Sequence, residues 1–314
     1  MKKALIINIA AMAAASFMLI GCSGIKVTKP MMKLILKASM KIPENTVADD
    51  YEGKIDIPYV EGGDPAQMLD VFYAPQAVRN DAVLVDIHGG FYVAGQKEGN
   101  RAFASVFLKE GFDVVLISYR LNDGKRDVSD ELADCAAALD YVTVHAEELG
   151  LNKDCMFVTG DSAGGHLALY MAEGSEDRTL PVHTEFFTAK GALLNCPAYN
   201  YAAYSHAETY SKSFLEWFLG PRYLDEQWME SMSPRTHLSS YSGPLFVSTC
   251  TNDFIRGESM TLKDDCEAAG RELMFVDIES DDKKVAHVHN VTSIDLPESQ
   301  TVNAAMIDFM NNLL

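Results

Sequence analysis

The chain has 314 residues, of which 48% are hydrophobic and 10% aromatic, and its formal net charge at pH 7 is −19. This length and apolar content suffice for one large α/β domain with a full core or for two small ones, and the lack of repeats, low-complexity tracts and long linkers favours one domain with insertions. Such acidity argues against nucleic acid as a partner, because phosphate binding needs clustered Lys and Arg.

The first 21 residues have the features of an export signal. A basic start precedes an almost wholly apolar run at positions 4–20, and small residues come before Cys22. Leu19-Ile20-Gly21-Cys22 resembles the lipobox of bacterial lipoproteins, which implies cleavage before Cys22 and acylation of that cysteine. An uncleaved membrane helix is the alternative, although the apolar run is slightly short for a span. We therefore expect residues 1–21 to be a lipoprotein signal peptide and the protein to be extracytoplasmic, held on a membrane through lipidated Cys22.

Residues 22–50 form a separate segment with a basic helix in an otherwise acidic chain. Apolar residues and lysines recur there at helical spacing, and the lysines fall on one stripe. Such a helix suits an anionic membrane face, or it docks on the main domain and exposes its lysines; the number of apolar positions favours docking. The stripe consists of Lys29, Lys33, Lys37 and Lys41.

Signals for strands and helices alternate from residue 54 to the C-terminus, within a main domain at residues 51–314. Apolar runs that alternate with helices indicate a mostly parallel sheet covered on both faces, and the first two strands are expected to pair antiparallel. In such a sheet the chemistry gathers at the carboxyl ends of the strands. Strands are expected at 54–60, 68–73, 82–87, 113–118, 155–159, 191–195, 244–250 and 273–278, and helices at 101–110, 128–149, 258–269 and 300–313.

The strand at 155–159 leads into Gly160-Asp161-Ser162-Ala163-Gly164-Gly165, which opens a helical run. A strand, Gly-x-Ser-x-Gly and a helix in this order form the context of a nucleophile elbow, a turn so tight that only small residues fit beside the serine. We therefore predict that Ser162 is a nucleophile. A Gly/Ser-rich loop that only caps a helix is the alternative, and the flanking elements disfavour it. Asp161 is expected to bond to neighbouring backbone.

Several segments together resemble the α/β-hydrolase fold, and more narrowly the hormone-sensitive-lipase-like carboxylesterases with their relatives among acetyl esterases. The resemblance covers the chain from about residue 54 to the C-terminus. It implies a serine esterase whose site residues follow the order nucleophile, acid, base. The segments that carry it are His88-Gly89-Gly90, Ser118-Tyr119-Arg120-Leu121, Gly160 to Gly165, Thr251-Asn252-Asp253 and a late histidine.

This chain order points to Asp253 and to a histidine near the C-terminus. Asp253 directly follows the strand at 244–250, so we expect it to be the acid, with a turn or a helix cap as the alternative. The loop before the closing helix holds His287 and His289, and neither is followed by the family's pattern of a small residue and then an aromatic. We prefer His289 as the base, because its distance from the closing helix is closer to that of the family, and keep His287 as the runner-up.

No metal or cofactor is expected. The pair His287 and His289 could bind a metal, but no further ligand has convincing spacing, and the sequence has no Cys-x-x-Cys. With Cys22 acylated, five cysteines remain, an odd number that cannot all pair, and we expect free thiols.

The negative oxygen of a tetrahedral intermediate needs fixed hydrogen-bond donors. The amide of Ala163, just after the nucleophile, and those of Gly89 and Gly90 are expected to supply them. His88 would brace this loop. The family often has a third glycine where this chain has Phe91, a departure that fits the shorter variant of smaller esterases. A glycine turn without a catalytic role is the alternative.

The insertion at residues 199–241 is expected to form a helical lid, and it holds both tryptophans of the chain. Phe214, Trp217 and Phe218 are spaced i, i+3 and i+4, so they share one helix face. Most of the aromatic residues in the insertion are expected to pack it on the body of the domain, while a minority line an acyl pocket or stack on a sugar.

The sequence as a whole predicts a lipid-anchored serine carboxylesterase. Its substrates would be short-chain esters, acetyl groups on carbohydrate among them, a choice that the resemblance alone supports. Hydrolysis would run through an acyl-enzyme at Ser162 and need no cofactor. A serine exopeptidase of the prolyl-oligopeptidase kind shares the fold and the triad, but usually carries a propeller domain for which we expect no room. The third alternative is a catalytically inactive surface binding protein, against which the complete triad pattern argues.

Overall fold

The computed structural model of the protein describes residues 28–39, 51–208 and 210–314. The predicted signal peptide at residues 1–21, the lipidation site Cys22 and much of the segment at residues 22–50 lie outside the described residues. Within the described ranges, no helix combines the length and the apolar character needed to cross a membrane.

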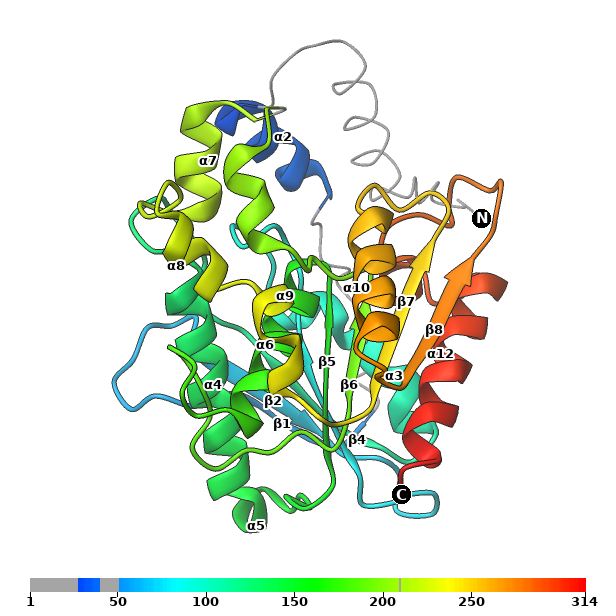
Figure 1. Cartoon of the computed structure of the whole chain (residues 1–314). Helices are drawn as coiled ribbons and strands as arrows, with labels where there is room; N and C mark the ends of the chain where they lie inside the picture. The colour runs from blue at the N-terminus through cyan, green and yellow to red at the C-terminus, as the bar shows by residue number, and fades with distance from the viewer. Residues whose placement is uncertain (1–27, 40–50, 209) are drawn as a thin grey trace, which may run out of the picture.

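An eight-stranded sheet runs through the domain (Figure 1). In chain order its strands are β1 (Gly53–Pro58), β2 (Met68–Phe72), β3 (Val83–Ile87), β4 (Asp113–Ile117), β5 (Met156–Asp161), β6 (Ala192–Asn195), β7 (Leu245–Cys250) and β8 (Leu273–Ile278). Across the sheet they are ordered β1-β2-β4-β3-β5-β6-β7-β8. Strand β2 is antiparallel to both β1 and β4, and every other neighbouring pair is parallel. The expected mostly parallel sheet with an antiparallel start is therefore confirmed.

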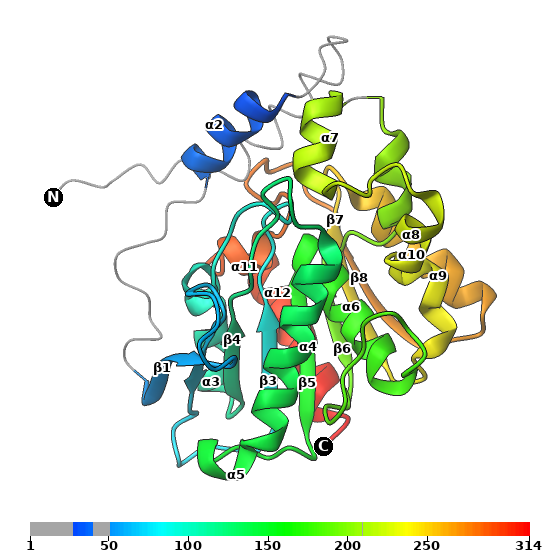
Figure 2. The same cartoon turned by 90° about the vertical axis from the view of Figure 1, so that its left-hand side faces the viewer.

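Helices cover both faces of this sheet (Figure 2). They are α3 (Arg101–Lys109), α4 (Val128–Val144), α6 (Ala163–Glu176), α10 (Arg256–Ala268), α11 (His289–Thr292) and α12 (Pro297–Asn311). Helices α4, α6 and α10 contribute to one apolar cluster, and α3, α11 and α12 to a second cluster on the opposite face. The helix expected at 128–149 is divided, because the chain leaves helical geometry at His145 before the short α5 (Ala146–Leu149), which Gly150 ends in a left-handed conformation.

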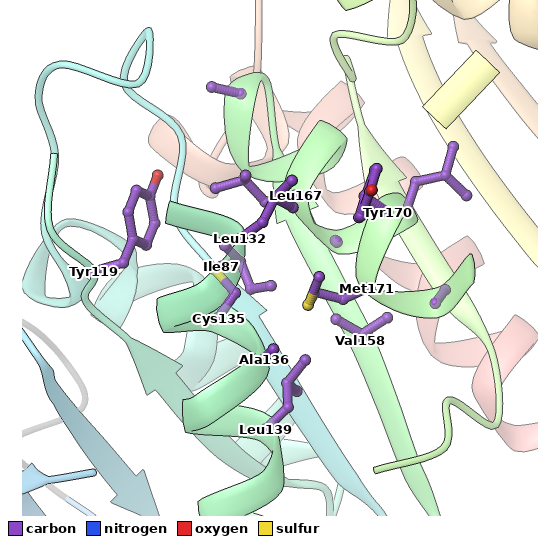
Figure 3. Close-up of a cluster of buried hydrophobic side chains, with 14 of the residues drawn as sticks. Ile87, Tyr119, Leu132, Cys135, Ala136, Leu139, Val158, Leu167, Tyr170 and Met171 are labelled. Atoms are coloured by element: carbon purple, nitrogen blue, oxygen red, sulfur yellow. The ribbon is translucent and has the colours of Figure 1, made fainter. Parts of the chain in front are cut away.

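A buried apolar cluster fixes the helix that begins directly after Ser162 (Figure 3). Leu167 and Met171 of α6 lie in one cluster with Leu132 and Leu139 of α4, and all four side chains are fully buried. Truncation of such a leucine to alanine costs about 2–5 kcal/mol, because it leaves a cavity as well as losing apolar contact. The start of α6 is therefore held in a fixed place above the sheet.

Residues 199–208 and 210–241 form a helical insertion between β6 and β7, next to the carboxyl ends of the strands (Figure 1). Its elements are η3 (Tyr201–His206), α7 (Lys212–Leu219), α8 (Glu226–Ser231), α9 (Pro234–His237) and η4 (Leu238–Ser240). Two of the short helices have side-chain caps, since Ser211 and Asp225 accept hydrogen bonds from the backbone N–H groups of Phe214 and Trp228.

Helix α2 (Lys29–Ser39) lies against α7 (Figure 2). Met32 is fully buried, and the Nζ atoms of Lys29 and Lys33 lie 5.4 and 5.6 Å from the ring centre of Trp217. This is a cation–π arrangement, which an indole ring favours. Leu34, by contrast, is 71% exposed. The basic helix therefore docks on the insertion, as expected, with the ammonium groups of Lys29 and Lys33 near the Trp217 ring while Lys33 stays exposed.

Candidate active site

The turn between β5 and α6 is built as tightly as the sequence predicted. Ser162 has φ 55° and ψ −119°, a strained conformation outside the usual regions. A Cβ atom on Gly160 would collide with the carbonyl oxygen of Gly164, and one on Gly164 would collide with that of Ile87. Only glycine fits at these two positions, so the serine side chain is presented at the first turn of α6.

Ser162, His287 and Asp253 form a continuous hydrogen-bonded chain. The Nε2 atom of His287 lies 2.9 Å from Ser162 Oγ, and its Nδ1 atom lies 2.7 Å from Asp253 Oδ1. All three side chains are buried, with 6–8% of their surface exposed. Three segments from distant parts of the sequence therefore meet at the carboxyl ends of β5 and β7 and in the loop before α11. A serine, an imidazole and a carboxylate at these distances can activate the serine as a nucleophile.

The carboxylate of Asp253 is held in place from several sides. It accepts hydrogen bonds from Thr249 Oγ1 at 2.9 Å and from the backbone N–H of Ile255 at 3.0 Å, in addition to the contact with His287. Burial acts to raise the pKa of Asp253, but the charge and hydrogen bond of His287 and the other donors outweigh it, and the pKa lies below its usual value. This side chain is therefore an ionised, oriented acceptor for the imidazole.

The prediction that His289 is the base is wrong, because His289 lies away from Ser162 and His287 contacts it instead. It is the first residue of α11, and its Nδ1 atom lies 2.9 Å from Ser299 Oγ in α12. Burial lowers the pKa of His289 to about 4. Between the two histidines Val288 has φ 53°, a left-handed conformation that turns their side chains apart. The added turn of α11 lengthens the path from the base to α12, which is why the spacing argument selected the wrong residue.

The amide of Gly89 is already engaged, so it does not belong to the expected set of oxyanion donors. Its N–H donates to Asp161 Oδ1 at 2.9 Å. Among the described residues, the amides of Gly90 and Ala163 have no acceptor, and Gly90 follows directly after the tethered amide. The geometry therefore leaves Gly90 and Ala163 as donors for a negative oxygen beside Ser162.

A buried hydrogen-bond network of Asp161, Asn100 and Asp86 holds this glycine loop in place. Asn100 donates through Nδ2 to Asp161 Oδ1 at 3.0 Å and to Asp86 Oδ2 at 2.9 Å. Burial, with the nearby Asp161 charge, raises the pKa of Asp86 well above its usual value. Sequence reasoning missed Asn100 and Asp86, because neither stands in a motif and only the fold brings them to Asp161.

His88 has the bracing role that its position suggested. Its ring stacks on Tyr119 with 4.4 Å between ring centres and 12° between planes. The hydroxyl of Tyr119 donates to His88 O at 2.6 Å, and His88 Nδ1 lies 2.8 Å from Gly89 O. The imidazole is buried and turned toward its own loop, so it is positioned to shape the backbone rather than to react.

A small aromatic pocket opens beside Ser162. Residues of the insertion form part of its wall, while Trp217 packs on α2 and Tyr201 and Trp228 are buried in the body of the domain. The expected division of the aromatic residues, most for packing and few for the pocket, thus describes the structure. The lining consists of Phe91, Tyr92, Ser162, Ala163, Ala198, Tyr204, Tyr210, Phe218, Phe254 and Ile255.

The described cysteines are all free thiols, as expected, and one of them lies beside the hydrogen-bonded chain. Cys196 Sγ, a carboxylate oxygen of Asp253 and a ring nitrogen of His287 lie within 4.8 Å of one another. This is a metal-ligand combination that spacing in the sequence did not indicate, since it uses His287 without His289.

Comparison with known proteins gives a family match and several similar proteins. The family BD-FAE matches residues 69–259, which is more than half of the chain. The probable carboxylic ester hydrolase LipM of Mycobacterium tuberculosis is 31% identical over 214 residues, covering 65% of this chain and 49% of LipM. Carboxylesterase NlhH of the same species is 26% identical over 243 residues, covering 75% of this chain and 72% of NlhH. Among solved structures, esterase B from Lactobacillus rhamnosis has a TM-score of 0.75 at 22% identity, covering 97% of this chain and 95% of that one.

These similarities agree with the arrangement of the sheet and helices. The likeness to esterase B extends over almost the whole of both chains, and the predicted α/β-hydrolase fold is confirmed. The chain spans about half the length of LipM, so the match covers only part of that relative.

Proposed function

Because the chain belongs to the BD-FAE family, we propose that it is a serine carboxylesterase that hydrolyses short-chain esters through an acyl-enzyme intermediate. The observation that carries this proposal is the chain of contacts from Ser162 Oγ through His287 to Asp253, at 2.9 and 2.7 Å. Two unengaged amides stand beside the serine, where the negative oxygen of a tetrahedral intermediate would lie. The names of LipM and NlhH, both ester hydrolases, agree with the proposal.

In the proposed mechanism His287 takes the proton of Ser162 through Nε2 as the serine oxygen attacks the ester carbonyl. Asp253 accepts the Nδ1 proton of His287 in a hydrogen bond, which fixes the tautomer and stabilises the imidazolium. The amides of Gly90 and Ala163 bind the oxygen that becomes negative. His287 then returns its proton to the leaving alcohol. Water, activated by the same imidazole, releases the acyl group in a second round of these steps.

The pocket supports a preference for short acyl groups, because the side chains that line it leave little open space beside Ser162. Phe218, Tyr204 and Tyr210 of the insertion wall one side, and the ring of Phe254 lies parallel to that of Phe91 with 5.8 Å between centres. A short acyl group needs a smaller rearrangement of these rings than a long chain, which would need the insertion to move. Acetyl esters on carbohydrate are our candidates for natural substrates.

Hydrolysis of a substrate series tests the proposal. We expect cleavage of p-nitrophenyl acetate and butyrate, slower cleavage of the octanoate, and a loss of about a thousandfold or more in kcat for Ser162→Ala and His287→Ala. His289→Ala is the matched control and should keep most of the activity. Unchanged hydrolysis in Ser162→Ala would exclude the mechanism. Preferential cleavage of a peptide p-nitroanilide would instead identify an exopeptidase, and no turnover of any substrate by the wild type would identify a binding protein.

We also propose that the mature protein begins at Cys22 and is held outside the cytoplasm by acyl chains on that residue. The support is the sequence Leu19-Ile20-Gly21-Cys22 and the apolar run before it. Mass spectrometry of the N-terminal peptide from the native host tests this, and an unmodified Cys22 would refute it.

A further inference from the structure

Cys196 lies beside Asp253 and His287, the proposed acid and base. It follows β6 directly and has φ 46°, a left-handed conformation that is uncommon for cysteine. Its N–H donates to Ser248 O at 2.7 Å, and its Sγ accepts a hydrogen bond from the N–H of Val288 at 3.3 Å. The thiol is 1% exposed. The position of the sulfur is therefore set by the backbone on both sides and not by free rotation into a cavity.

The three ligand atoms are already close to the geometry of a metal site. Bond lengths of about 2.3 Å to sulfur and about 2.0 Å to nitrogen and oxygen place the ligands of tetrahedral Zn²⁺ about 3.3–3.6 Å apart. Cys196 Sγ, the Asp253 carboxylate and the His287 ring nitrogen lie within 4.8 Å of one another, so small side-chain rotations would bring them to a common ion. A thiolate and a carboxylate balance the charge of a divalent cation, which lowers the cost of burying it.

A second layer of hydrogen bonds orients two of these ligands. The Val288 N–H points at the sulfur, and Thr249 Oγ1 and the Ile255 N–H bond to the Asp253 carboxylate. Partners of this kind fix ligand orientation in metal sites. A soft sulfur ligand favours Zn²⁺ or Cd²⁺ over Mg²⁺ and Ca²⁺.

We propose that Cys196, Asp253 and His287 form an inhibitory binding site for a thiophilic divalent cation such as Zn²⁺. This inference rests on the proposed esterase function of the same residues. On binding, the Cys196 thiol releases its proton to solvent and forms the metal–sulfur bond. The ion takes the Nδ1 lone pair of His287, and the imidazole proton moves from Nδ1 to Nε2. That nitrogen then donates to Ser162 Oγ and cannot accept its proton, so hydrolysis stops until the ion leaves.

Metal binding can be tested without catalysis. Ser162→Ala keeps all three ligands, so titration of this full-length variant with Cd²⁺ should produce the ultraviolet charge-transfer band of a cadmium thiolate at one ion per chain. The band should be lost when Cys196→Ala is added and kept when Cys250→Ala is added. Cys250 is the matched control, since it is also a buried free thiol but does not belong to the ligand group. A band that does not depend on Cys196, or no band, would overturn the proposal.

Inhibition is measured with the wild-type enzyme and p-nitrophenyl acetate. We expect Zn²⁺ to inhibit, EDTA to restore activity, and Mg²⁺ to have no effect. The inhibition constant should rise about 100-fold in Cys196→Ala and less in Cys196→Ser, and stay unchanged in Cys250→Ala. Zinc inhibition that survives in both Cys196 variants would refute the site. The experiments distinguish failure of the esterase proposal from failure of the metal-site proposal. A Cys196-dependent cadmium band without any ester hydrolysis would refute the esterase proposal alone. Zinc-insensitive hydrolysis without the band would refute the metal-site proposal alone.

Discussion

Asp161 holds the loop that presents Gly90, so its removal should slow the chemistry although it does not touch the substrate pocket. Its Oδ1 atom accepts hydrogen bonds from Gly89 N at 2.9 Å and from Asn100 Nδ2 at 3.0 Å. The side chain is nearly buried, and a hydrogen bond to a carboxylate in such a place contributes about 1.5–3 kcal/mol to stability. Asp161→Ala removes this acceptor and leaves two N–H groups without their partner.

Two losses should follow from this substitution. The free energy of unfolding should fall by about 2–4 kcal/mol, because buried donors without an acceptor keep their full desolvation cost. The kcat for p-nitrophenyl acetate should fall between about tenfold and a thousandfold, the upper limit being the loss of one oxyanion donor. KM should change little, because the loop amide binds the oxygen most strongly in the transition state.

Steady-state kinetics and urea denaturation measure these effects on the same preparations. Asp161→Asn is the matched control, since it keeps an acceptor oxygen near Gly89 N and removes the repulsion with Asp86. It should recover most of the kcat lost in Asp161→Ala. An Asp161→Ala enzyme with reduced stability but wild-type kcat would show that the position of Gly90 does not depend on this carboxylate, and the reasoning would fail.

Three further predictions concern the pocket, the elbow and a buried histidine. Phe218→Ala should enlarge the pocket and raise the octanoate-to-acetate ratio of kcat/KM about tenfold or more, and an unchanged ratio would show that this ring does not limit acyl length. Gly164→Ala should prevent stable folding or abolish hydrolysis, as circular dichroism and the acetate assay will show, because its Cβ would collide with Ile87 O. Burial lowers the pKa of His166 to about 3 against about 6.5 unfolded, so its contribution to stability is complete above about pH 6.5 and is lost as the pH falls toward 3. Through this group the wild type loses up to about 1.4 kcal/mol of unfolding free energy per pH unit between pH 6 and 4. His166→Asn should therefore reduce this decline. The reasoning is contradicted if urea denaturation gives the same dependence of the unfolding free energy on pH for the two proteins.

Local sequence patterns were enough to predict the buried strands, which are marked by apolar runs, and the tight turn at Ser162. The strands expected at 82–87 and 113–118 differ from β3 and β4 by one residue, because every position of both strands is buried and apolar runs mark their ends. Ser162 and Asp253 were also predictable, since Ser162 follows β5 directly, Asp253 comes three residues after the end of β7, and the chain order of the fold separates their roles. Only the fold could show that they meet through His287.

The rest depended on long-range contacts or on backbone conformations that the sequence disfavours. Val288 adopts a left-handed conformation that a β-branched residue rarely takes, and this residue separates His287 from His289. The pair Gly89 and Gly90 was visible in the sequence, but the capture of the first amide by Asp161, 72 residues away, was not. The sequence did not predict that Cys196 lies beside Asp253 and His287, because its neighbours in space come from distant segments, namely β7 and the loop before α11.

Backbone strain in the described part of the chain gathers around this site. Such conformations cost about 1–3 kcal/mol each, and their sum is comparable to the net stability of a domain. They persist because neighbouring groups hold them: the hydroxyl of Tyr92 lies 2.6 Å from His166 Nδ1, and Val288 N donates to Cys196 Sγ. The loops are thus fixed before any substrate arrives, which is the condition for amides and imidazole to stabilise a transition state without reorganising. Of the seven described residues other than glycine with positive φ, five line the pocket or adjoin His287 and Asp253: Phe91, Tyr92, Ser162, Cys196 and Val288.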